Sequence, residues 1–183
     1  MKKEVNIIII SWELHEFNIE KIKTFNRTFD YGIYQIYGKH KAYGREALLY
    51  IGKAEDRTFA TRLQDGGRID SDFNYSTIEP THIRLGYITI DNSDLANKKY
   101  NLEQYKLNEN WAKSIKVAEK LLIATHPPAL NKVLGHKWQD FNFDESYLIL
   151  NGGDYGDLQP EVSTFSVEFC DFFDNYFLRT DDK

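Results

Sequence analysis

The sequence predicts an α+β protein in which a small mixed β-sheet is flanked by helices. Two short β-prone stretches, 31–38 and 46–53, are joined by a polar link that contains glycine, which is typical of a β-hairpin. A third strand is predicted at 81–90, where alternate residues are suited to one face: Ile83, Leu85, Tyr87 and Thr89. The segment 108–126 has the apolar spacing of an amphipathic helix. We expect an added N-terminal strand and an acidic, aromatic C-terminal extension around this core.

The N-terminal elements follow from composition and capping. Residues 4–12 are apolar and rich in β-branched side chains, which favours a strand. Residues 15–26 have a looser helical spacing. A short helix is predicted over 57–65, with Asp56 as its N-cap because a carboxylate accepts from unpaired backbone N–H groups. The glycine pair 66–67 is expected to end that helix.

The second half of the chain contains the clearest helix. The helix predicted at 108–126 is closed by the proline pair 127–128, because proline cannot continue a helix. The polar segment 91–107 before it reads as a loop or an exposed helical insertion. Strand-like pieces follow at 146–150 and 162–170.

Length and composition indicate one domain with an appendage. We expect a domain over 1–131, with its core at 31–131, and a docked extension over 132–183. A hydrophobic content of 42% and 27 aromatic residues are enough for a real core. The single cysteine, Cys170, excludes an internal disulfide and fits a reducing compartment. The apolar run 7–10 is too short to span a membrane, so a cytoplasmic protein without membrane contact is expected.

Charge is distributed unevenly along the chain. The net charge is −5, but residues 1–131 hold 19 Lys and Arg against 17 Asp and Glu. Residues 132–183 contain 4 Lys and Arg against 11 Asp and Glu, so the excess negative charge lies in the C-terminal part. The first two-thirds can therefore present a local basic face, and the acidic total does not exclude DNA as a partner.

Glu119 is unusual for its place on the predicted helix. On a helical wheel it lies inside the apolar sector, near Ile115, Leu122 and Ile123. An isolated buried carboxylate is costly, so it must be paired, protonated or bound to a metal. One interpretation is a structural salt bridge to an arginine of a neighbouring helix. The other is a ligand for Mg²⁺, which binds through one or two carboxylates and keeps several waters.

Two tripeptides end or begin with tyrosine on the predicted hairpin. They are Gly32-Ile33-Tyr34 and Tyr50-Ile51-Gly52, and facing strands would bring the two phenols to one end of the sheet. Tyrosine favours strands and usually packs there, so the pair alone does not separate packing from function.

Taken in order, these motifs resemble the GIY-YIG endonuclease family, as seen in excision-repair and restriction-type members. The run 50–54 (Tyr-Ile-Gly-Lys-Ala) is followed by Arg62-Leu63, and 119–131 reads Glu-x-x-Leu-Ile-x-x-x-x-Pro-x-x-Asn. The resemblance implies the GIY-YIG nuclease fold and a metal-dependent endonuclease that hydrolyses DNA phosphodiester bonds. It further implies Mg²⁺ or Mn²⁺ as cofactor and no nucleotide cofactor.

The resemblance also suggests a role for each matched residue. Tyr34 would be the general base and Tyr50 would hydrogen-bond the phosphate or the attacking water. Because a free phenol has a pKa of about 10, Tyr34 needs a cationic neighbour, which Lys53 would supply unless it is simply solvated. Arg62 would donate to the scissile phosphate.

Two further residues complete the set of expected site residues. Glu119 would hold the metal ion. Asn131 would orient the glutamate end of the site or tie down the chain after the prolines. Arg57 competes with Arg62, but the two point about 140 degrees apart on a helix, and the Arg-Leu pair favours Arg62. Gly66 stands where some restriction-type members have a histidine, so no histidine-assisted step is expected.

Three rival functions stay open from the sequence. The chain could be a nuclease that needs a partner protein, because no appended DNA-reading motif is evident. It could be a self-contained restriction-type homodimer whose enlarged region 64–110 reads the target. It could also be a catalytically silent DNA- or protein-binding module on the same fold.

Overall fold

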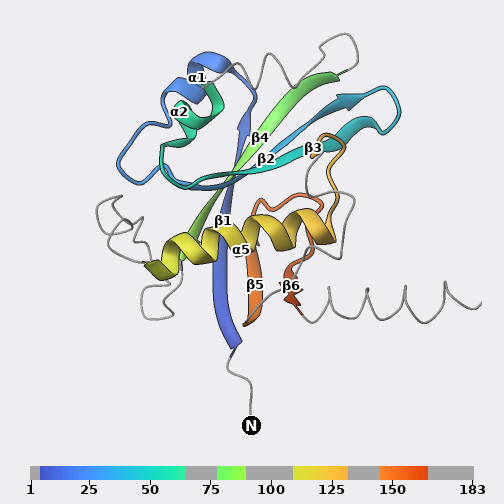
Figure 1. Ribbon diagram of the computed structural model, residues 1–183. Coiled ribbons are helices and arrows are strands. Elements are labelled where there is room, and N and C mark those ends of the chain that lie inside the picture. The colour runs from blue at the N-terminus through green and yellow to red at the C-terminus, as the bar shows by residue number, and fades with distance from the viewer. Residues whose placement is uncertain (1–4, 65–77, 90–108, 132–144, 165–183) are drawn as a thin grey trace, which may run out of the picture.

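Six strands form one mixed sheet in the order β3-β2-β4-β1-β5-β6 (Figure 1). The computed structural model describes residues 5–64, 78–89, 109–131 and 145–164. Paired strands are antiparallel except for β1 and β5, which are parallel, so the expected α+β class with a mixed sheet is confirmed. The elements are β1 (Val5–Glu16), α1 (Ile19–Lys23), β2 (Gly32–His40), β3 (Gly44–Ala54), α2 (Phe59–Gln64), β4 (Ile78–Thr89), α5 (Glu109–Thr125), β5 (Ser146–Gly153) and β6 (Glu161–Ser163).

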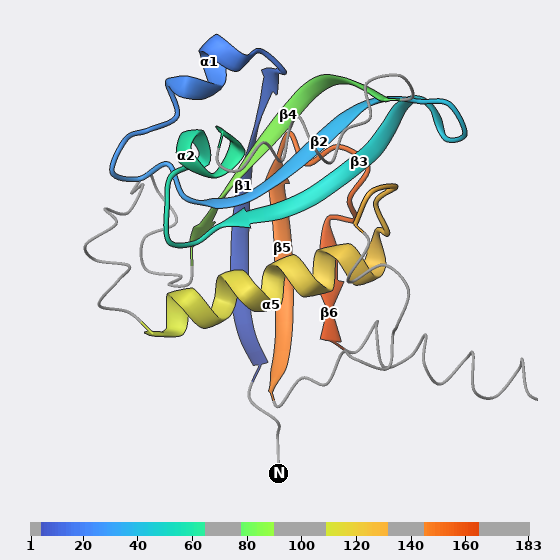
Figure 2. The same cartoon turned by 45° about the horizontal axis from the view of Figure 1, so that its top comes forward.

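Helices cover both faces of the sheet (Figures 1 and 2). The long helix α5 crosses β1 and β5, whereas α1 and α2 lie together against β2 and β4. The α5 side is built from Ile8, Ile10, Trp12, Ile33, Ile51, Trp111, Ile115, Leu122 and Ile149. The opposite side is built from Ile22, Phe25, Tyr34, Ile36, Leu49, Phe59, Leu63, Ile83, Leu85 and Tyr87. None of the described helices combines the length and apolar character needed to cross a membrane.

The first strand is longer than the stretch 4–12 predicted. Residues 9–16 pair with β4, from Ile9 opposite Thr89 to Glu16 opposite His82, so the strand continues into the region expected to be helical. The helix predicted at 15–26 begins only at Ile19, because the Asn18 side chain accepts from the next N–H groups and caps it there.

The cap predicted for α2 is wrong. Thr58, not Asp56, occupies the N-cap, because its hydroxyl accepts from the N–H of Thr61 at 3.3 Å and its carbonyl accepts from that of Arg62 at 2.8 Å. Asp56 instead pairs with the adjacent Arg57. The glycine pair 66–67, expected to end this helix, lies outside the described residues.

The C-terminal segment contributes two strands to the same sheet. β5 runs parallel to β1, and the indole N–H of Trp12 donates to Asn151 at 2.9 Å across the pair. β6 pairs with β5 over 161–163, so it includes residues 162–163 of the second predicted strand, of which 165–170 lie outside the described residues. The described part of the extension is thus joined to the domain by backbone pairing.

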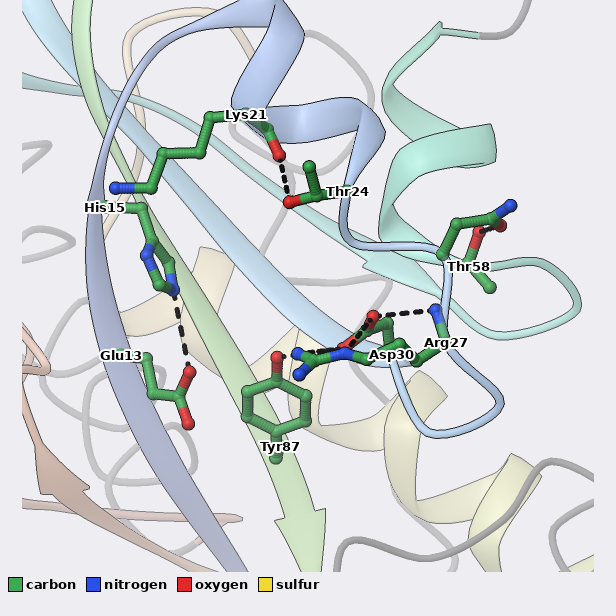
Figure 3. A network of polar contacts seen from close by, with 9 residues as sticks. Glu13, His15, Lys21, Thr24, Arg27, Asp30, Thr58 and Tyr87 are labelled. Carbon is green, nitrogen blue, oxygen red and sulfur yellow. Dashed lines mark hydrogen bonds and ion pairs between the residues drawn. The ribbon is translucent and has the colours of Figure 1, made fainter.

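A buried carboxylate holds the loop before β2 against α2 (Figure 3). Asp30 is fully buried and accepts from the backbone and guanidinium N–H groups of Arg27 and from the Tyr87 hydroxyl. Its own carbonyl accepts from the N–H of Phe59, the first residue of α2, at 2.8 Å. Burial and the nearby Asp30 carboxylate raise the pKa of Tyr87 well above its usual value, so its hydroxyl stays a donor.

Removal of this carboxylate should destabilise the fold. Asp30→Ala removes the buried carboxylate that accepts from the Tyr87 hydroxyl and from Arg27, and should lower the free energy of unfolding by about 2 kcal/mol. The matched control is Asp56→Ala, whose exposed ion pair with Arg57 should contribute less than about 1 kcal/mol. Urea denaturation of both variants would measure the difference, and equal losses would contradict the assigned role of Asp30.

Candidate functional site

The two tyrosines lie side by side on the α2 face of the hairpin. Their ring centroids are 6.0 Å apart, with an interplanar angle of 25°. Tyr34 pairs with Gly52, and Tyr50 pairs with Ile36. The register shifts next to this pair, because Tyr37 is opposite Leu48, and the extra residue Leu49 therefore packs on the same side as Tyr50. The sequence expectation that facing strands bring the phenols together is confirmed.

The glycine that follows Tyr50-Ile51 makes room for both rings. A Cβ on Gly52 would lie 2.5 Å from the Tyr34 phenol oxygen and 2.6 Å from Cε1 of Tyr50. Gly32, at the start of the other tripeptide, has φ +147° and would place a Cβ 2.0 Å from the Gly86 carbonyl oxygen. Both glycines are therefore required by packing around the tyrosines and the central strand.

Tyr34 and Tyr50 differ in their access to solvent. Tyr34 is 3% exposed and its ring meets Phe59 of α2 edge to face, with centroids 6.5 Å apart. Tyr50 is only partly buried. The ring of Tyr34 is thus part of the hydrophobic core, whatever its hydroxyl does.

Glu119 is partly buried on α5 and paired with a lysine of the sheet. Its side chain is 16% exposed, and Oε2 lies 3.3 Å from Nζ of Lys53. Burial raises the pKa of Glu119 above its ordinary value, and the charges of Lys53 and Arg62 partly oppose that shift. A structural ion pair was one of the two interpretations of this residue, but the partner comes from β3 rather than from a neighbouring helix.

Lys53 faces the carboxylates of Glu119 and Glu55. Successive strand residues point to opposite faces, so Lys53 lies on the α5 side while Gly52 and the phenols lie on the other. Its ammonium also lies 3.4 Å from Glu55, and Lys116 of α5 lies 3.0 Å from the same Glu55. Lys53 is therefore placed to neutralise Glu119 and Glu55 rather than to face Tyr34.

Glu55 and Lys116 were not anticipated from the sequence. Lys116 precedes Glu119 by three residues, which puts both on adjoining sectors of one helix. That spacing was the only available signal. Glu55 lies near Lys53 and Lys116 only because α5 packs beside β3, and no local sequence pattern predicts that packing.

Arg62 supplies the guanidinium group near Glu119. Its charge lowers the pKa of the Glu119 carboxyl, and its Nε is buried without a hydrogen-bond partner in the described part of the chain. Arg57, the competing arginine, pairs with its neighbour Asp56. The structure thus brings Arg62, rather than Arg57, into the electrostatic environment of Glu119.

Asn131 ties the segment after α5 to the edge strand β3. Its Oδ1 accepts from the N–H of Ile51 at 3.0 Å, and its Nδ2 donates to the Ile51 carbonyl at 2.8 Å. The N–H groups of Ala129 and Leu130 donate to the carbonyls of Leu48 and Leu49. Of the two roles expected for Asn131, the structure supports fastening the chain after the prolines.

The donor set fits a cation held largely by substrate and water. The described residues contain no group of three or more His, Cys, Asp or Glu that could hold a metal. Mg²⁺ needs only one or two protein carboxylates when phosphates and waters complete its shell. Glu119 suits this, because a bound cation would offset the burial that disfavours its charge.

The shifted pKa of Glu119 predicts how stability depends on pH. Because the folded-state pKa is raised above the ordinary 4.5, the wild type should lose stability as pH rises from about 4.5 through the folded-state pKa. Glu119→Gln lacks this titration, so its stability relative to wild type should rise over the same window and then level off. Chemical denaturation of both proteins between about pH 4 and pH 8 would measure this difference in the free energy of unfolding. A relative stability that falls with pH would mean that pairing with Lys53 outweighs burial.

No family model, curated protein or solved structure matches this chain. The likeness to the GIY-YIG endonucleases therefore rests on the motifs at 32–34, 50–54, 62–63 and 119–131.

Proposed function

We propose that this chain is a divalent-metal-dependent endonuclease of the GIY-YIG type that hydrolyses DNA phosphodiester bonds. The observation that carries the proposal is the electrostatic cluster of Glu119, Lys53 and Arg62 at the end of β3, in a β2–β3 hairpin whose other face carries the stacked Tyr34 and Tyr50. These groups come from separate segments of the chain and match the order of the family motifs.

Arg62 is the proposed phosphate-binding residue. Its Nε is buried without a partner in the described residues, and an unsatisfied buried donor is costly. A phosphate oxygen would satisfy it, and the planar guanidinium can bind two oxygens at once. Arg62 would thereby stabilise the negative charge that accumulates on the scissile phosphate.

Glu119 is the proposed ligand of Mg²⁺ or Mn²⁺. When bound, such an ion withdraws charge from the phosphate oxygens. Glu119 would hold the ion from the protein side with its partly buried carboxylate, and Lys53 would balance the charge of that carboxylate before the ion arrives.

The tyrosines are proposed to deprotonate and to position the attacking water. Tyr34 would accept a proton at its phenolate oxygen, which lies against Gly52, where a Cβ would come within 2.5 Å of it. Tyr50, the more exposed of the pair, would hydrogen-bond the water or the phosphate.

The tip of the β2–β3 hairpin is a proposed DNA contact outside the site. Lys41 and Arg45 are exposed there, and Tyr43 is 69% exposed with its ring 4.8 Å from that of His40. The N–H groups of Ala42 and Tyr43 donate to Nδ1 of His40, which holds the turn in one conformation.

A catalytically silent binding module is the rival function. Two observations favour it: Tyr34 is almost fully buried, and Glu119 is already paired with Lys53. Wild-type protein that binds DNA yet leaves supercoiled plasmid uncut in Mg²⁺ and in Mn²⁺ would decide for the rival.

The tyrosine pair offers the sharpest test of the proposed roles. Tyr34→Phe keeps the core ring but removes the base, so plasmid nicking in Mg²⁺ should slow by about 10²-fold to 10⁴-fold. Tyr50→Phe removes a positioning hydrogen bond and should slow it by about tenfold. Wild-type rates should rise into the alkaline range, as a phenolate base requires. A Tyr34→Phe variant with near-normal rate and unchanged pH dependence would leave Tyr34 as a core residue only.

DNA binding should depend on salt through a few phosphate contacts. Each neutralised phosphate contributes about −0.9 to the slope of log K against log salt, and we expect a slope of about −2 to −4. Lys41→Ala and Arg45→Ala should each make the slope shallower by about 0.9. Lys23→Ala on α1, where the lysine pairs with Glu20, is the matched control and should change nothing. A slope near about −10 would indicate a much larger basic surface.

A further inference from the structure

Four charged side chains form a continuous chain between β3 and α5. Oε2 of Glu119 lies 3.3 Å from Nζ of Lys53, and the same Nζ lies 3.4 Å from Oε2 of Glu55. The other oxygen of Glu55, Oε1, lies 3.0 Å from Nζ of Lys116. Charges alternate along the series, and one ammonium serves both carboxylates.

The position of Lys53 conflicts with a second cation at Glu119. An ammonium within salt-bridge distance of a carboxylate repels any other cation that binds the same group, and the partial burial of Glu119 weakens screening by solvent. A divalent ion at Glu119 must therefore compete with Lys53 or move it away.

Glu55 offers Lys53 a second acceptor. Lysine has a flexible four-carbon stem, and its ammonium already lies within salt-bridge distance of Oε2 of Glu55, so the transfer requires no backbone movement. Lys116 engages the opposite oxygen of Glu55 and keeps Oε2 turned toward Lys53.

We propose that Lys53 is an internal counter-ion that occupies Glu119 in the metal-free protein and shifts onto Glu55 when a divalent cation binds. Glu55 is then a positioning residue that sets the affinity of Glu119 for the cation through Lys53, without touching the cation itself. This inference rests on the proposed metal role of Glu119. It adds a metal-free state of the site in which Lys53 neutralises Glu119.

The test is a double-mutant cycle on Mn²⁺ binding without DNA. Binding would be followed by the electron paramagnetic resonance signal of free Mn²⁺, with Glu119→Gln as the reference for ions bound elsewhere. Lys53→Met should tighten Mn²⁺ binding by about tenfold. A neighbouring positive charge changes the proton affinity of a carboxylate by at least about tenfold, and we expect a comparable effect on its affinity for a cation. Glu55→Gln should weaken it severalfold, because Lys53 then has only Glu119 as its partner.

The decisive arm is Glu55→Gln in the Lys53→Met background. If Glu55 acts only through Lys53, the double variant should bind Mn²⁺ within about twofold of Lys53→Met, a non-additive result that shows the two residues to be coupled. A Glu55→Gln loss that persists without Lys53 would make Glu55 a metal ligand and overturn the inference. A Lys53→Met affinity equal to wild type would also overturn it.

The outcomes separate this inference from the proposed function. If wild type, Lys53→Met and Glu119→Gln all bind Mn²⁺ equally, the metal role of Glu119 fails and the counter-ion role fails with it. If binding depends on Glu119 but not on Lys53, only the counter-ion role fails. Circular dichroism and thermal melting of each variant would establish that the compared proteins are folded.

Discussion

The seam between β3 and the segment after α5 determines the geometry of the candidate site. β3 is an edge strand, and an edge exposes backbone N–H and C=O groups that need partners. Residues 129–131 supply them, through backbone bonds to Leu48 and Leu49 and through both ends of the Asn131 amide on Ile51. Because this seam fastens the end of α5 beside β3, it also fixes Glu119 relative to Lys53.

The candidate site residues near the end of β3 are divided between the two faces of the sheet. The tyrosines and Arg62 belong to the side covered by α2, whereas Glu119 and Lys53 belong to the side covered by α5. The buried Asp30 network holds α2, and the Asn131 seam holds α5. Near the end of β3 the chain keeps a partly buried carboxylate, that of Glu119, and a buried Arg62 Nε that has no hydrogen-bond partner among the described residues. Such costly groups cluster at functional sites, which is why they support a binding or catalytic role.

Local patterns predicted the third strand and α5 from their periods, and the hairpin from two β-prone stretches joined by a polar link that contains glycine. Alternation in β4 and the lone carboxylate in the apolar sector of α5 are both visible in the sequence, and both are confirmed. The parallel pairing of β1 with β5 joins segments about 140 residues apart, and no local period encodes it. The cap at α2 was predicted at Asp56 because a carboxylate can accept from unpaired backbone N–H groups, but the helix begins at Phe59, so Thr58 caps it. Glu55 was missed because its role depends on the packing of α5.

The most direct measurement is the conversion of supercoiled plasmid by wild type and by Glu119→Gln, in Mg²⁺ and in EDTA. We expect nicked or linear DNA only for wild type in Mg²⁺, and cutting by the folded Glu119→Gln variant should be slower by orders of magnitude. Lys120→Gln, which changes an exposed charge next to Glu119, should cut like wild type. Equal cutting by wild type and Glu119→Gln would contradict the assigned site, and cutting in EDTA would contradict its dependence on metal.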